Sequence, residues 1–471
     1  FKCFDLSRLS YEISSFECKE CANRCEINRV VVEGEKPLYY GSRCEKYDVD
    51  RRAAVESPYP DYFAERDEML LAPYVPSEAP PSNAPKVGIP RALLFYELYP
   101  FWQAFLRELG CEIVITDPTT KKIIHNGVER SVAETCFPMK VALGHTLNLL
   151  EKEIDYIFLP SVINLPLPDK RMTDSFVCPY VQSFCYTVKS AIDFNAAGVK
   201  VLQPVIYLQL GREHKIKALE EVGRVLGRSR NEVARAVAAA EENLALFQKR
   251  LRERGKEVLA EIKPDEKAIV MVGRAYNTCD PGANLEIPKK LSKMGVRCLP
   301  MDFLPLDDVR LPDEWRNMYW RYGQKILCAA EIVAEDSRLY PVYLTNFGCG
   351  PDSFVHKFFR ERLGSKPSLV IEVDEHSADA GMITRCEAFL DSIANANGKA
   401  VGGRFFRPVN IEKGTHRTIL IPNMSAHAHA LAGAFEACGM KAEVLPEPDE
   451  ETLELGRQFT TGKECFPCIV T

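Results

Sequence analysis

The 471-residue sequence lacks the features that mark several classes of protein. It has no signal peptide and no apolar run near the ~20 residues that a membrane-spanning helix needs. Positive charge is not in excess either, because 60 Lys and Arg stand against 66 Asp and Glu, for a net charge of −6. These absences argue against a membrane protein and against a surface for nucleic acid. We therefore expect a cytoplasmic protein that binds neither.

Glycine-rich phosphate loops are also missing. The sequence contains neither a G-x-G-x-x-G fingerprint nor a G-x-x-x-x-G-K-[ST] loop. Gly273 and Arg274 follow an expected strand, at the end where α/β sheets bind ligands. Without a glycine-rich loop, a nucleotide site there is disfavoured, and we expect no ATP hydrolysis by this chain.

Cysteine, in contrast, is abundant, with 17 residues. An odd number and C-x2-C spacing favour reduced thiols that bind metal over a disulfide framework. One group of cysteines lies near the N-terminus and consists of Cys18, Cys21, Cys25 and Cys44. An expected β-hairpin (NRVVVEGEKPLYYGSR) would bring Cys44 back to the first three. Four thiolates suit either Zn²⁺ or a [4Fe–4S] cluster, and both remain open. Free cysteines in a loop are the alternative.

A second pattern recurs four times along the chain. In ETCFPMK, FVCPYVQS, NFGCGPDSF and GKECFPC, a cysteine stands just before a proline at the expected start of a helix; these are Cys136, Cys178, Cys349 and Cys465. Proline is favoured in the first helical turn. Unpaired N–H groups and the helix dipole stabilise a thiolate there, together with any anionic cluster that it holds.

The first three of these cysteines follow expected parallel strands, whose carboxyl ends meet in one crevice. We predict that Cys136, Cys178 and Cys349 converge there on an iron–sulfur cluster, with Cys465 as their counterpart in a further module. Scattered structural cysteines are the alternative. Cys185 is expected in the core, and Cys279 is kept as a weaker candidate ligand. The remaining cysteines that we expect to be small buried hydrophobes are Cys111, Cys298, Cys328, Cys386 and Cys438. No acid–base residue can be assigned.

Alternating strand and helix patterns predict an α/β fold with two or more doubly wound, parallel-sheet (Rossmann-like) subdomains. A repeat supports a further module, since the Ile-Pro to Cys-Phe-Pro pattern at Pro90–Cys136 returns at Pro422–Cys465. Because the sequence begins at Phe1, we expect a piece of a longer polypeptide. The predicted organisation is a Cys-rich metal-binding knuckle (1–57), a Pro-rich linker (58–86), a first α/β subdomain (87–210), a helical segment (211–263), a second α/β subdomain (264–410) and the truncated start of the repeated module (411–471).

The motifs together carry a resemblance. The chain resembles the 2-hydroxyacyl-CoA dehydratase and benzoyl-CoA reductase superfamily. The segments that carry this resemblance are GIPRALLFYELYPFW, ETCFPMK, VCPY, MVGRAYN with DPG and IPKKL, and NFGCGPDSF. The opening ECKECANRCEINRVVVEGEKPLYYGSRCEKYD block resembles its acyl-CoA dehydratase activase-related branch. The resemblance implies a [4Fe–4S] or double-cubane cluster held by Cys136, Cys178 and Cys349. It also implies a separate or upstream ATP-hydrolysing activase that delivers low-potential electrons.

Two functions follow as hypotheses. The first is an iron–sulfur redox component, of the dehydratase or reductase kind, that passes electrons from an activase to a small substrate. An acyl-CoA is the substrate class that the resemblance implies. The second is a non-catalytic α/β scaffold with a zinc-stabilised knuckle, and a pure electron carrier lies between the two. A homodimer is left open as an assembly.

Overall fold

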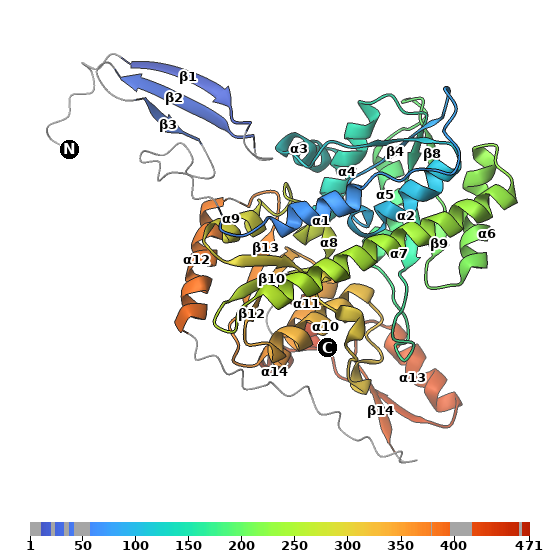
Figure 1. Cartoon of the computed structure of the whole chain (residues 1–471). Coiled ribbons are helices and arrows are strands. Elements are labelled where there is room, and N and C mark those ends of the chain that lie inside the picture. The colour runs from blue at the N-terminus through green and yellow to red at the C-terminus, as the bar shows by residue number, and fades with distance from the viewer. Residues whose placement is uncertain are drawn as a thin grey trace.

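The computed structural model describes residues 11–19, 24–32, 37–41, 57–377, 379–395, 417–460 and 464–471 (Figure 1). It confirms the predicted α/β class, because two four-stranded parallel sheets form the body of the described chain. No helix in these ranges is long and apolar enough to cross a membrane.

The first sheet has the strand order β5-β4-β6-β8. Its strands are β4 (Lys86–Ile89), β5 (Glu112–Ile115), β6 (Tyr156–Phe158) and β8 (Lys200–Leu202), and the helices between them are α2 (Phe95–Glu108), α3 (Lys121–Arg130), α4 (Phe137–Leu150) and α5 (Pro179–Ala191). The buried residues of α2 include Phe101, Trp102 and Phe105, which join the main core. We call this part the first unit.

The second sheet repeats the same order, β11-β10-β12-β13. Its strands are β10 (Ala268–Gly273), β11 (Arg297–Pro300), β12 (Leu339–Asn346) and β13 (Leu369–Val373), and its helices are α8 (Ala275–Thr278), α9 (Ile287–Lys293), α10 (Arg321–Glu335), α11 (Gly350–Leu363) and α12 (Asp379–Asn395). β10 and β12 are buried along their whole length, as expected for central parallel strands. In both units the order reverses beside the first strand, which creates a crevice at the carboxyl ends.

From its apolar pattern, each of the segments DYIFLPSVI and VKVLQPVIYL is predicted to form a single strand, and both predictions are wrong in extent. Each segment breaks at a proline, Pro160 or Pro204, which has no N–H to donate to a sheet. The residues that follow form β7 (Ser161–Asn164) and β9 (Val205–Tyr207), which pair with each other in a separate two-stranded sheet. This small sheet carries the chain toward α5 and Cys178.

A long helix connects the two units. α6 (Arg212–Val225) is followed by α7 (Arg230–Glu261). The sequence predicts a capping box between Ser229 and Glu232, and α7 begins with it. The sequence also predicts an apolar face for this helix, and of its residues Leu244 is partly buried and the others are buried: Val237, Ala240, Phe247, Leu251 and Val258. α7 packs against α2 of the first unit and against the short helix η2 (Met301–Phe303) of the second. α7 therefore lies across both units (Figure 1), and one continuous hydrophobic core includes residues of both.

The segment expected to be a Pro-rich linker contains a helix instead. α1 (Tyr62–Leu71) has Tyr62, Arg66 and Leu70 buried on one face, at the spacing of successive helical turns. Arg66 forms an ion pair of 2.6 Å with Asp302 of the second unit, and the Tyr62 ring contacts Phe303 edge-on. The prolines flank this helix, so composition alone concealed it.

Smaller sheets lie toward the two ends of the described chain. The N-terminal sheet is antiparallel, with β1 (Tyr11–Glu17), β2 (Glu26–Val32) and β3 (Leu38–Tyr40), and the β2–β3 pairing confirms the expected hairpin. The C-terminal part consists of β14 (Thr418–Ile421), α13 (His427–Ala437), β15 (Lys441–Val444), α14 (Glu450–Phe459) and α15 (Phe466–Val470). Its parallel β14–β15 pair matches the β4–β5 pair that the repeat predicts. Cys438, expected to be buried, is exposed just beyond α13.

Candidate functional site

Each of the four proline-associated cysteines caps the start of a helix. Cys136 precedes α4, Cys178 precedes α5, Cys349 precedes α11 and Cys465 precedes α15, and a proline occupies the first turn in every case. The expected position at a helix start is therefore confirmed for all four. Their role as ligands stays a prediction.

Cys178 lies within electrostatic range of both Cys136 and Cys349. Burial raises the pKa of Cys136 to about 11 and that of Cys349 to about 12, and the Cys178 thiol acts in the same direction on both. All three thiols also influence the buried Tyr276, which lies in α8. Two cysteines of the first unit and one of the second thus share a neighbour. We call these three cysteines the cysteine trio.

Cys465 is placed differently from the trio. It is exposed at the start of α15, and its described sulfur neighbour is Cys468, one turn farther along the same helix. α15 packs against α14 of the C-terminal part. Cys178 thus interacts electrostatically with both Cys136 and Cys349, whereas Cys465 lies in the repeated module.

Arg274 is the cation of the site. Its Nη1 lies 2.9 Å from Cys349 Sγ and 2.6 Å from Asp352 Oδ2, and the Thr345 hydroxyl donates to the same carboxylate oxygen at 2.5 Å. Burial by itself lowers the pKa of Arg274, but the Asp352 carboxylate and the Cys349 thiol outweigh it and hold that pKa above its usual value. Arg274 is 3% exposed, so it remains a fixed positive charge beside the trio.

The backbone at the end of β10 explains how Arg274 reaches this place. Gly273 has φ of 152°, and a Cβ at this residue would lie 2.5 Å from the Leu344 carbonyl oxygen of β12. Only glycine permits that approach. One turn later, Asn277 donates to Asn346 Oδ1 at 2.7 Å, which ties α8 to the end of β12.

A cavity of about 370 Å³ opens beside Cys349, at the start of α11. Its lining includes Cys349, Asp352 and His356 of the α11 region, and Glu372 of β13. The His356 side chain is buried and packs edge-on against Tyr343, with ring centroids 5.6 Å apart. One wall of this cavity is therefore a member of the trio.

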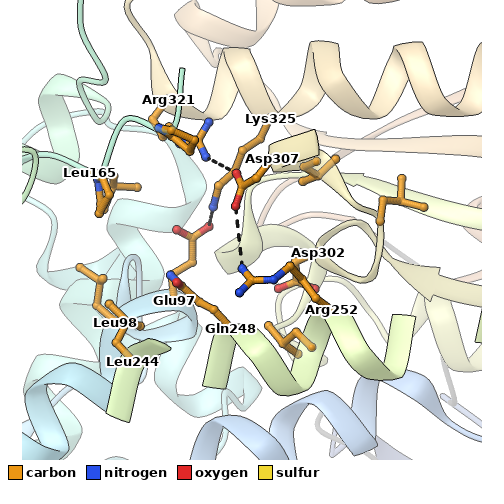
Figure 2. Close-up of a pocket in the computed structure, with 15 residues that line it drawn as sticks. Glu97, Leu98, Leu165, Leu244, Gln248, Arg252, Asp302, Asp307, Arg321 and Lys325 are labelled. Carbon is orange, nitrogen blue, oxygen red and sulfur yellow. Dashed lines mark hydrogen bonds and ion pairs between the residues drawn. The ribbon is translucent and has the colours of Figure 1, made fainter. Parts of the chain in front are cut away.

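A second cavity, of about 220 Å³, lies between the two units, and Figure 2 shows its lining. Leu98, Leu165 and Leu244 form its apolar side. Ion pairs form the other side: Lys325 with Glu97 at 2.7 Å, Arg321 with Asp307 at 3.0 Å and Arg252 with Asp307 at 3.9 Å. The basic groups that border it are thus compensated by carboxylates of the protein itself.

Tyr322 stands between this second cavity and the trio. Its ring lies 5.4 Å from Lys325 Nζ on one side, and 6.0 Å from Arg274 Cζ and 5.9 Å from the Tyr276 ring on the other. The phenol is buried, and burial is the main cause of its raised pKa. The two cavities are therefore separate features of the site region.

Two groups of polar contacts join the first unit to the second. Lys140, one turn beyond Cys136, pairs with Glu134 at 2.5 Å and with Glu375 of the second unit at 2.6 Å. Elsewhere on the interface, Thr119 donates to Asp280 Oδ2 at 2.6 Å and contacts His145 Nε2 at 2.8 Å. Neither link was predicted, because each joins residues far apart in sequence.

Part of the N-terminal cysteine group can be described. Cys18 and Cys25 are buried together with Ile27, and the Cys18 N–H donates to the Cys25 carbonyl oxygen at 2.8 Å. Lys121 Nζ of α3 lies 3.7 Å from Cys25 Sγ. The other two predicted ligands, Cys21 and Cys44, lie outside the described residues. Zinc or an iron–sulfur cluster at this knuckle stays a prediction.

The donor chemistry of the trio can be compared with the predicted cluster. Within the described ranges, no group of three or more His, Cys, Asp or Glu side chains is suited to hold a metal ion. A [4Fe–4S] cube differs from a single ion, because each thiolate binds a different iron and the ligands are spaced more widely. Three thiols at helix starts with a buried arginine suit such an anionic group. The reserve candidate, Cys279, instead lies beside Arg66 and Asp302.

Comparison with known proteins gives one family match. Residues 86–304 match a family described as the CoA enzyme activase uncharacterised domain, and no curated protein matches the chain. Solved structures with some likeness include ZnuA, at 13% identity over 67% of this chain and 100% of that chain, with a TM-score of 0.21. Another is FpvC with Ni²⁺ from P. aeruginosa, at 11% identity over 66% and 96%, with a TM-score of 0.20. TM-scores this low establish no common fold.

Proposed function

We propose that this chain is an iron–sulfur redox component that receives low-potential electrons from an ATP-dependent activase and reduces or dehydrates a small substrate. The observation that supports the proposal is that three helix-capping cysteines of two units interact electrostatically with their neighbours in this region, and that a buried arginine contacts one of them, Cys349. The family match over residues 86–304 supports a role related to CoA enzymes and their activases. Acyl-CoA is therefore the substrate class that we propose.

The protein residues would act on the cluster in distinct ways. Cys136 and Cys178 from the first unit and Cys349 from the second would hold it, each losing its proton as the metal binds. When bound, a [4Fe–4S] or double-cubane cluster supplies one-electron chemistry and, with three protein thiolates, an iron position open to substrate. The start of each helix and the Arg274 guanidinium would offset its negative charge.

The cavity beside Cys349 would admit the reacting end of the substrate. Its volume of about 370 Å³ accommodates a short acyl group rather than a whole coenzyme A. The buried His356 and the Asp352 carboxylate border it, and they are the polar groups that we expect to orient the substrate. The coenzyme part would then remain at the surface.

The test is anaerobic reconstitution of the full chain with iron and sulfide. We expect bound iron and sulfide, visible absorption, and an electron paramagnetic resonance (EPR) signal after reduction with dithionite. The variants Cys136→Ala, Cys178→Ala and Cys349→Ala should each lose iron and the part of that signal which belongs to a cluster at the trio, while any signal from the N-terminal knuckle should persist. Cys185→Ala is the matched control, because Cys185 is buried in the same helix that Cys178 caps, two turns beyond the start.

Two results would overturn the proposal. One is a reconstituted protein that holds zinc but neither iron nor sulfide, which would favour the scaffold. The other is an iron signal that survives all three substitutions and disappears with Cys18→Ala, which would place the only cluster at the N-terminal knuckle. Substrate binding is tested separately: a short-chain acyl-CoA should alter the EPR signal of the reduced protein, and free coenzyme A should not.

A further inference from the structure

Arg274 and Asp352 form a buried ion pair, which is weak evidence for a role in stability. Both side chains are nearly inaccessible, at 4% and 3% exposure, so removing two charges from water opposes their attraction. Such a pair is seldom retained for stability alone. Its geometry suggests what else it does.

The guanidinium is oriented toward sulfur by the carboxylate. Nη1 contacts both Cys349 Sγ and Asp352 Oδ2, while the Thr345 hydroxyl fixes that carboxylate oxygen from the other side. The Tyr322 ring stacks near the guanidinium. Arg274 therefore has one buried orientation, and in it an N–H group points at a predicted cluster ligand.

Two buried polar atoms of the pair remain without a partner among the described residues. They are Nε of Arg274 and Oδ1 of Asp352. A buried donor without an acceptor lowers stability. The unpaired Nε is therefore a second sign that Arg274 is not retained for stability alone.

We propose that Arg274 is a positioning residue for the cluster: it orients the Cys349 thiolate and, by donating to its sulfur, raises the reduction potential of the cluster. The inference rests on the proposed function. The physical reason is that an added electron makes the cluster more negative, so a fixed cation and an N–H donor stabilise the reduced state more than the oxidised state.

The second member of the pair sets the strength of this effect. The Asp352 carboxylate cancels much of the field of the Arg274 charge beyond the pair. The effect of Arg274 on the Cys349 sulfur is therefore mainly that of the directional N–H contact. Only the part of a charged hydrogen bond that differs between the two redox states affects the potential, and this part is smaller than the whole. We therefore expect about a tenfold effect on the equilibrium for accepting one electron, equivalent to a shift of 59 mV.

The test measures the midpoint potential of the reconstituted protein by EPR-monitored redox titration. Arg274→Gln alone would leave Asp352 as a buried unpaired charge, so the main variant is the double substitution Arg274→Gln/Asp352→Asn, which removes both charges. We expect it to bind iron with all three thiols present and to have a lower midpoint potential by about a tenfold change in the reduction equilibrium. Arg274→Lys, which keeps the charge, should shift the potential less.

Arg66→Gln/Asp302→Asn is the matched control. Arg66 is buried and pairs with Asp302, which is 27% exposed, at the same 2.6 Å, but the two lie beside Cys279 rather than the trio. The control should lose stability and keep the wild-type potential. Equal potentials in the wild type and the Arg274→Gln/Asp352→Asn variant, both loaded with iron, would overturn this inference and leave the proposed function standing. A wild-type protein that binds no iron would overturn both.

Discussion

The link between Lys140 and Glu375 gives the sharpest stability prediction. Lys140 is 5% exposed, and its ammonium group joins α4 of the first unit to the end of β13 in the second. Substitution with Met keeps most of the aliphatic stem and removes the charge. Glu375 would then remain mostly buried, at 16% exposure, without its cation.

The magnitude follows from the two partners. Glu134 is 88% exposed, so its pair with Lys140 contributes at the scale of surface ion pairs, about 0–1 kcal/mol. The pair with Glu375 is shielded and hydrogen-bonded, and is expected to contribute about 2 kcal/mol. We expect Lys140→Met to lower the free energy of unfolding by about 2–3 kcal/mol. Glu134→Gln should lower it by less than about 1 kcal/mol.

The assay is urea unfolding followed by both circular dichroism and tryptophan fluorescence, for the single variants and for Lys140→Met/Glu375→Gln. The double-mutant cycle should give a coupling of about 1–2 kcal/mol. A coupling below about 0.3 kcal/mol, within the usual additivity of independent sites, would refute the reasoning. It would show that the contact between Lys140 and Glu375 does not stabilise the packing of the two units against each other.

The pH dependence of the same link provides a second check. Burial is the largest influence and tends to raise the pKa of Glu375, but the hydrogen bond and charge of Lys140, together with a backbone hydrogen bond, outweigh it and lower that pKa. Its contribution is therefore present above the unfolded-state pKa, about 4.3, and is lost as the pH falls through the lower folded-state pKa. The pKa of Lys140 is raised by its glutamates despite burial, so its contribution is lost only as the pH rises above about 10.4. Between these limits the difference between wild type and Lys140→Met should be constant.

Two further substitutions test local packing. Gly144→Ala places a Cβ 1.9 Å from the Ile123 carbonyl oxygen of α3, so it should destabilise the protein by about 1–3 kcal/mol in thermal unfolding. Gly381→Ala, in a helix with open space around it, should have the opposite sign, and equal losses would contradict the packing argument. Ser229→Ala removes the side-chain acceptor of the α7 capping box and should cost about 1 kcal/mol; an unchanged unfolding midpoint would show that the cap contributes nothing.

Local signals predicted much of this fold. A proline two residues after Cys136 or one after Cys178 restricts the backbone of its own turn, so the helix starts could be read from sequence without knowledge of the surroundings. The capping box at Ser229 is equally local. The alternation of strands and helices predicted the α/β class for the same reason.

Features that depend on distant residues could not be predicted in this way. The contact between Arg274 and Cys349 joins the ends of two strands, and sequence reasoning had noted Arg274 only as a residue in a ligand-binding position. Asp352 and Tyr276 carried no signal of their own. The helix α1 had a signal that was overlooked, since Tyr62 and Leu70 recur at helical spacing between the prolines.

The continuous core across the two units has a consequence for how such a gene can change. The matched family region ends at residue 304, before β12 and before Cys349. A recombination event between Cys178 and Cys349 would separate the trio, and it would also separate apolar surfaces that are buried together. Exchange of one unit alone would therefore divide the trio and expose apolar surface that the other unit buries.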